Sequence, residues 1–158
     1  VHSCINGLGE RTGNAALEEL MVGLEVLLGY KTNYKFDEIL SLCKLAEEIS
    51  GVTPATNKPV IGKGNYTRES GIGVDMVMKK PLSMFATAPQ FFGREGEVVL
   101  GKKSGKASIT WALEKLGIEN VSDEAVAEIL AEVKVMGAEK RALLSPEEFK
   151  GIVDRKLT

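Results

Sequence analysis

Hydrophobic residues recur at helical spacing in two segments near the start of the chain. The first follows a short apolar stretch and a glycine-rich loop, and its apolar positions are Leu17, Leu20, Met21, Leu24, Leu27 and Leu28. This pattern predicts a strand over residues 1–6, a loop, and a helix that begins near Asn14 and ends at Gly29. The second segment predicts a helix closed by Gly51, with one face formed by Phe36, Ile39, Leu40, Cys43, Ala46 and Ile49. Together these elements are typical of the tail of an α/β unit.

The middle of the chain has a different composition. Eight of the 17 glycines and four of the five prolines lie between Val52 and Gly105. We therefore expect a loop-rich linker with one short helix over residues 70–79. Helical patterns return afterwards, over residues 106–116, 123–136 and 146–156.

The predicted fold class is α/β leading into mostly α. Three parts are expected along the chain: residues 1–51, the loop-rich residues 52–104, and a small helical subdomain over 105–158. The last helix has the clearest start signal, because Ser145 precedes Pro146, Glu147 and Glu148 and so offers a cap, a first-position proline and a third-position glutamate.

Composition narrows the function classes. The 158 residues include 20 basic and 22 acidic side chains, so the chain has no basic surplus for nucleic-acid binding. No apolar run reaches the length of a membrane span, and a cytoplasmic protein is expected. Two cysteines and one histidine are too few for a disulfide scaffold or a histidine-rich metal site. Any bound metal would therefore need ligands of other kinds or from another chain. Because the chain starts at Val1 with a strand, we expect it to be the carboxyl-terminal piece of something longer.

The first candidate for chemistry is the glycine-rich loop over residues 6–14. It lies between a predicted strand end and a predicted helix start, where α/β proteins build their sites. Glu10 and Arg11 supply opposite charges, and the side-chain carbonyl of Asn14 is a suitable oxygen ligand for a cation. The plainer interpretation is that Asn14 caps the helix and Glu10 pairs with Arg11 in solvent.

Two later glycine-bearing stretches are also candidates. Residues 66–75 place Arg68, Glu69 and Asp75 around two glycines, where an arginine could hold a carboxylate in a bidentate manner; a surface turn entering a helix explains the same residues. Residues 101–106 contain three lysines that could attract cofactor phosphates. They lack the spacing of a phosphate-binding loop, and a solvated basic helix start is the favoured explanation.

The order of these stretches resembles a known enzyme family. The run Cys4-Ile5-Asn6-Gly7-Leu8-Gly9-Glu10-Arg11-Thr12-Gly13-Asn14-Ala15-Ala16-Leu17-Glu18-Glu19 is similar to a signature of the 2-isopropylmalate, homocitrate and citramalate synthases. The later runs Lys58-Pro59-Val60-Ile61-Gly62, Glu69-Ser70-Gly71-Ile72, Gly93-Arg94 and Val99–Lys106 follow in that family's order. The resemblance covers essentially the whole chain. It implies the end of a (β/α)8 TIM barrel, followed by linker subdomains.

The resemblance also implies an activity, its cofactors, its site residues and its partners. These enzymes are acyltransferases that join an acyl-CoA, usually acetyl-CoA, to a 2-oxo acid with a divalent metal such as Mn, Mg or Zn, and convert the acyl group to an alkyl group on transfer. Asn14 then matches a metal ligand, Glu10, Arg11 and Glu69 match catalytic positions, and Arg68, Ser70 and Asp75 match substrate-binding positions. A homodimer, or association with a missing amino-terminal barrel half, is implied as well, without nucleic acid or membrane partners.

Two departures limit the comparison. Gly73 stands where the family usually has a histidine that assists catalysis, and Phe85 stands near the place of its tyrosine partner. The family's aspartate and paired histidine ligands have no counterpart in these residues, so we expect the chain to be inactive alone. The alternative is a noncatalytic interaction or dimerisation module derived from the same family. Which 2-oxo acid would be used stays open.

Overall fold

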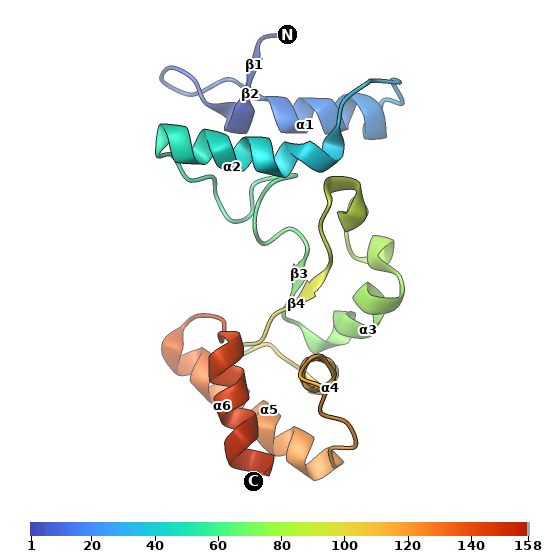
Figure 1. Cartoon of the computed structure of the whole chain (residues 1–158), viewed down its shortest axis with the longest axis vertical. Coiled ribbons are helices and arrows are strands. Elements are labelled where there is room, and N and C mark those ends of the chain that lie inside the picture. Colours follow the sequence, from blue (N-terminus) through green and yellow to red (C-terminus); the bar gives the residue numbers. More distant parts are fainter. Residues whose placement is uncertain (158) are drawn as a thin grey trace. The chain divides into compact units, whose positions relative to one another are not determined.

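The computed structural model describes residues 1–157, with the side chains of Asp75, Met78 and Pro81 left undescribed. The chain forms two compact units, shown in Figure 1. The first contains residues 1–66 and 87–95, and the second contains residues 67–86 and 96–158. The three-part division expected from composition stays a prediction.

The first unit opens with two short strands and a helix. Strand β1 (Ser3–Cys4) pairs in parallel with β2 (Ala15–Ala16), so that Ser3 lies opposite Ala15. The strand is shorter than residues 1–6 because Asn6 and Gly7 both have positive φ angles, which turn the backbone out of the extended conformation. Helix α1 (Leu17–Val22) continues as a π-helical turn, Gly23–Leu27, before Gly29 with its φ of +72°. The expected end at Gly29 is confirmed, and the expected start near Asn14 is wrong because residues 15–16 are extended.

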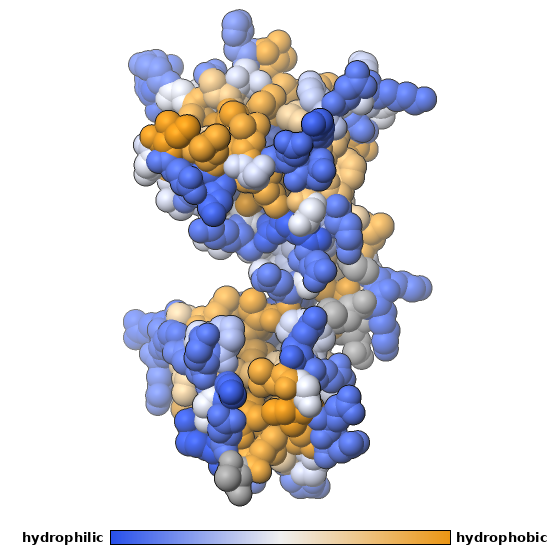
Figure 2. All heavy atoms as spheres, viewed as in Figure 1, coloured by the Kyte–Doolittle hydropathy of each residue, from blue (hydrophilic) through white to orange (hydrophobic). Residues whose placement is uncertain are grey.

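Helix α2 (Ile39–Ser50) follows a 3₁₀ turn and ends as expected at Gly51, where φ is +69°. Phe36, Ile39 and Cys43 are buried, as the apolar pattern predicts. The prediction is wrong for Ile49, which is 79% exposed. Figure 2 shows hydrophobic side chains on this part of the surface, and the exposed apolar residues of α2 are Leu42, Leu45 and Ile49.

The second unit begins with another pair of short parallel strands, β3 (Thr67–Arg68) and β4 (Glu97–Val98). Helix α3 (Gly71–Lys79) follows β3 and confirms the one short helix expected in the linker. Its first residue lies against Gly105, since a Cβ atom at Gly71 would be 2.5 Å from the Gly105 Cα. No side chain fits there, so this contact requires glycine at position 71.

Three further helices complete the second unit: α4 (Lys106–Lys115), α5 (Asp123–Lys140) and α6 (Pro146–Leu157). Their shared core consists of Leu100, Ile109, Ala112, Leu113, Val126, Ile129, Val133, Phe149, Ile152 and Val153. The Ser122 hydroxyl caps α5 by accepting the Ala125 N–H. Ser145 and Glu148 satisfy each other's backbone N–H groups at the start of α6, which confirms the predicted capping pattern.

The expected fold class is confirmed in its coarse form. The chain mixes small parallel strand pairs with helices and becomes helical towards its end. Within residues 1–157 the strands form two separate two-stranded sheets and no closed barrel, so the end of a TIM barrel stays a proposal. Within the same residues, every helix is too short or too polar to cross a bilayer.

Candidate functional site

The glycine-rich loop that links β1 to β2 is held by its own backbone. The Asn14 N–H donates to the Gly7 carbonyl at 3.0 Å, and the Gly13 N–H donates to the Glu10 carbonyl at 3.1 Å. Gly13 has a φ of +85°, and a Cβ atom there would lie 2.5 Å from the Gly7 oxygen. Only glycine satisfies both constraints, because an L side chain disfavours that φ and would collide with the carbonyl. The loop therefore has a defined shape that presents Asn14.

Asn14 is free of the capping role that the plainer interpretation gave it. The residue that caps α1 is Ala16, and no side chain caps that helix. The Asn14 Nδ2 instead donates to the Cys4 Sγ at 3.4 Å, and Gly9 leaves room for this amide because a Cβ there would be 2.9 Å from Nδ2. Asn14 is exposed, and no hydrogen bond from a described residue engages its side-chain carbonyl oxygen.

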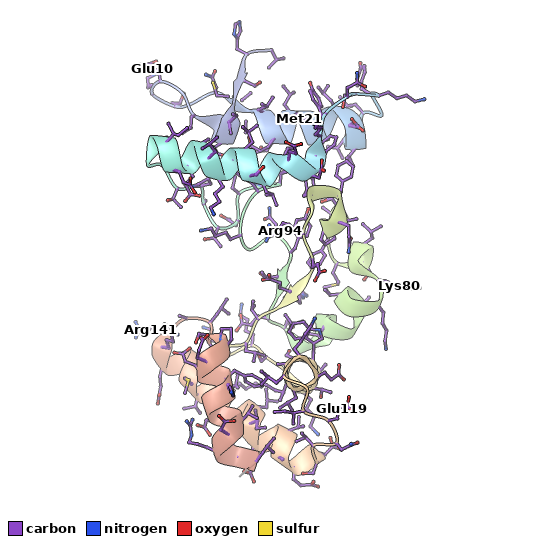
Figure 3. All side chains as sticks on the ribbon, viewed as in Figure 1. Glu10, Met21, Lys80, Arg94, Glu119 and Arg141 are labelled. Carbon is purple, nitrogen blue, oxygen red and sulfur yellow. The ribbon has the colours of Figure 1, made fainter. Side chains whose placement is uncertain are left out.

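Glu10 and Arg11 lie at the exposed end of the same loop. Figure 3 shows Glu10 pointing away from the helices. The two side chains form no ion pair with each other, so the expectation that they pair in solvent is wrong. Arg11 has a φ of +59°, so the backbone of the loop changes direction at this residue. Both charged groups are thus available to a ligand.

A buried carboxylate anchors the start of this loop. Glu18 is 1% exposed, and its Oε2 accepts the Asn6 N–H at 3.0 Å. The Lys58 Nζ lies 3.7 Å from the Glu18 Oε1 and 2.8 Å from the Glu19 Oε1. Burial acts to lower the pKa of Lys58, but the two carboxylates outweigh it and raise that pKa. The Asn6 Nδ2 donates to the Cys43 carbonyl at 2.8 Å, which ties the loop to α2.

Sequence reasoning missed Glu18 and Lys58 as a pair. The signal was available for Glu18, because it precedes Met21 and Val22 by three and four residues and so shares their buried helix face. A carboxylate on such a face needs a partner. Nothing in the spacing pointed to Lys58, which lies 40 residues later in an irregular segment.

The buried thiol of Cys43 next to this cluster predicts alkaline sensitivity. Burial, together with the nearby Glu18 charge, raises the pKa of Cys43 from 9.0 to about 11. Between these values the thiol ionises only in the unfolded chain, so the free energy of unfolding should fall as the pH rises from 9 to 11. Denaturant titrations across this range measure the loss. Cys43→Ala should reduce the slope; an equal slope in Cys43→Ala and in the unsubstituted chain would contradict this assignment.

The other predicted site residues belong to the second unit. The Glu69 Oε1 accepts the Lys103 N–H at 2.9 Å, so this carboxylate lies against the loop over residues 101–104. Ser70 precedes α3 as its capping residue but makes no side-chain cap bond. The Arg68 side chain turns towards Gly73, where a Cβ atom would be 2.7 Å from the Arg68 Nε. Asp75 belongs to α3, but its side chain lies outside the described residues.

The lysine-bearing loop over residues 101–106 has a structural explanation. The Ser104 hydroxyl accepts the Gly101 N–H at 3.0 Å and closes the turn. The turn packs on α5 at Gly137, where a Cβ atom would be 2.7 Å from the Lys102 nitrogen. Lys106 lies 3.6 Å from Asp123. These contacts support the interpretation of a solvated basic helix start.

The described residues contain no cluster of three histidine, cysteine or acidic side chains placed to hold a metal ion. The Asn14 carbonyl is an oxygen ligand of the type that divalent cations accept, and no described side chain competes for it. It can supply one of the several ligands that such an ion requires. The described residues alone do not complete a metal site.

Comparison with known proteins decides the family. Residues 60–141, just over half of the chain, match the family model of the homocitrate synthase post-HMGL domain-like proteins. Residues 1–46 match the HMGL-like family model. The chain belongs to the homocitrate and citramalate synthase family. The glycine-rich loop thus lies in the HMGL-like match, and the segment from Arg68 to Gly73 lies in the post-HMGL match.

Curated members of this family match most of the chain. It is 40% identical over 136 residues to a putative (R)-citramalate synthase of Archaeoglobus fulgidus. This alignment covers 86% of this chain and 28% of the relative. It is 37% identical over 157 residues to a homocitrate synthase of Methanocaldococcus jannaschii. This alignment covers 99% of this chain and 38% of the relative. A putative (R)-citramalate synthase of Methanopyrus kandleri is 41% identical over 137 residues. The chain therefore spans between a quarter and two fifths of the length of these relatives.

Proposed function

We propose that this chain is the carboxyl-terminal part of a cytoplasmic acyl-CoA:2-oxo acid transferase that condenses acetyl-CoA with a 2-oxo acid. The observation that carries the proposal is the shaped glycine-rich loop that presents the Asn14 carbonyl. The synthases named among its relatives support the reaction class. In this reaction the methyl proton of acetyl-CoA passes to a base, and the methyl carbon bonds to the oxo carbon. The carbonyl π bond breaks and the oxo oxygen takes up a proton to become a hydroxyl. Water then hydrolyses the thioester to release CoA.

Each predicted site residue has a proposed role. Asn14 would supply one oxygen ligand to a Mn, Mg or Zn ion, which polarises the oxo carbonyl when bound. Glu10 and Arg11 would act beside it as an exposed pair of opposite charges. Glu69 would be a further catalytic residue, and Arg68, Ser70 and Asp75 would bind substrate. A homodimer, or a partner that carries the missing barrel half, would complete the site.

Thiol release from acetyl-CoA tests this proposal. The assay uses pyruvate, 2-oxoisovalerate, oxaloacetate and 2-oxoglutarate with added Mn²⁺ or Mg²⁺, for the 158-residue chain alone and mixed with the amino-terminal barrel half of a related synthase. We expect turnover only in the mixture. Turnover by the chain alone would contradict the claim that its catalytic site is incomplete. No turnover in either sample would favour an interaction module.

A further inference from the structure

Strand β4 has one edge without a partner strand among the described residues. Its sheet contains β3 and β4, so β3 covers the other edge (Figure 1). The Val99 N–H donates to the Arg68 carbonyl at 2.9 Å and therefore points towards β3. Because backbone groups alternate between the two edges of a strand, the N–H and C=O of Val98 point away from β3. No hydrogen bond from a described residue outside the sheet engages them.

An apolar groove of about 550 Å³ is lined on one side by residues 97–100. Its other sides are lined by helix α4 and by the segment that leads into α6, so the whole groove belongs to the second unit. Trp111 is partly exposed there, and Leu116 and Leu143 are 40% and 46% exposed. The volume is typical of a binding cleft, and apolar side chains gathered at a surface mark an interaction site.

Leu144 shows that the open edge of β4 faces this groove. Its N–H donates to the carbonyl of Leu100, two residues beyond Val98, at 2.9 Å. Leu144, Leu100 and Val98 all line the groove. The pairing goes no further, because the next N–H, that of Ser145, donates to the Glu148 carboxylate at 2.7 Å. The backbone groups of Val98 are therefore left for another chain.

Lys115 gives the groove a charge preference on the side of α4. Its ammonium lies 5.5 Å from the centre of the Trp111 ring, and it forms no ion pair with another described residue. Among the described lining residues the other charged one is Glu97, which belongs to β4. A group that packs on Trp111 therefore meets a free positive charge, and an acidic side chain complements it.

We propose that this groove binds an extended segment of a partner protein, which adds to β4 at Val98. Alternate apolar side chains of the segment pack against Trp111, and an acidic side chain pairs with Lys115. Main-chain hydrogen bonds supply the affinity in this kind of recognition, and the pockets for alternate side chains supply the specificity. A small apolar acid suits the same lining but leaves the Val98 groups unbonded. The inference uses the second unit alone and does not depend on the condensing reaction.

Trp111 is the only tryptophan of the chain, so its fluorescence reports on the groove directly. The probe is the peptide acetyl-Leu-Thr-Leu-Thr-Glu-amide, added to the 158-residue chain. We expect a saturable change in emission and slower hydrogen exchange at the Val98 amide. Hexanoate, which has an apolar chain and a carboxylate but no peptide backbone, should bind more weakly. No saturable change, or tighter binding of hexanoate, would overturn the proposal.

N-methylated peptides separate strand addition from simple apolar contact. One peptide carries the methyl groups on its two leucine nitrogens and the other on its two threonine nitrogens. Successive N–H groups of an extended segment point to opposite edges, so only one of the two sets can face β4. That peptide should lose at least about tenfold in affinity, and the other should keep its affinity. Loss in both peptides, or in neither, would overturn the proposal.

Lys115→Gln tests the acidic side chain of the partner. We expect this variant to bind the glutamate peptide about twofold to fivefold more weakly, because the pair is exposed to solvent. A peptide with glutamine in place of glutamate should not distinguish the variant from the unsubstituted chain. Lys134→Gln is the matched control, at an exposed position of α5 outside the groove. Equal affinities of the two variants for the glutamate peptide would overturn the assignment of an acidic partner.

Discussion

Replacing Glu18 with alanine is expected to destabilise the first unit by about 1–3 kcal/mol. The substitution removes the acceptor of the Asn6 N–H and one of the two carboxylates beside Lys58. Because Glu18 is 1% exposed, water does not replace either contact. Hydrogen exchange of the amides in residues 3–7 and in α1 measures the local opening free energy of this unit.

Glu19→Ala is the matched control, because Glu19 is the next residue and contacts the same lysine at 2.8 Å. Its side chain is 38% exposed, so we expect a loss below about 1 kcal/mol. Glu18→Gln keeps an acceptor for Asn6 and should fall between the two. Equal losses in Glu18→Ala and Glu19→Ala would show that burial of the Glu18 carboxylate does not anchor the loop.

The helices of this chain were predictable because their signals are local. Apolar spacing located them, and Gly29, Gly51 and Gly117 end or follow helices with positive φ angles, as glycines at helix ends commonly do. Ser145 and Glu148 form the capping pattern that their spacing indicated. Each of these features depends on residues within one helical turn of each other.

The features that sequence reasoning missed depend on contacts between distant residues. Strand β2 consists of two alanines with no strand signal, and it exists because it pairs with β1. This pairing moved the helix start to Leu17 and released Asn14 from capping. The approach of Arg68 to Gly73 likewise follows from the fold of β3 against α3 rather than from either residue's type. The proposed roles of the site residues came from motif resemblance and stay predictions.

The second large effect is expected at Asn14. Its carbonyl is an oxygen of the glycine-rich loop with no competing hydrogen bond from a described residue, so its removal should weaken the metal site of the assembled enzyme. In the mixture that releases thiol, we expect Asn14→Ala to raise the Mn²⁺ concentration for half-maximal turnover by about 10-fold to 100-fold. Asn33→Ala, at an exposed position of the same unit, is the matched control.

The Mn²⁺ dependence of thiol release in Asn14→Ala tests the central claim most directly, since it joins the loop geometry to the chemistry. A large rise in the Mn²⁺ requirement, with no change in Asn33→Ala, is the predicted result. An unchanged Mn²⁺ requirement in an active Asn14→Ala mixture would contradict the claim that this loop contributes to the metal site.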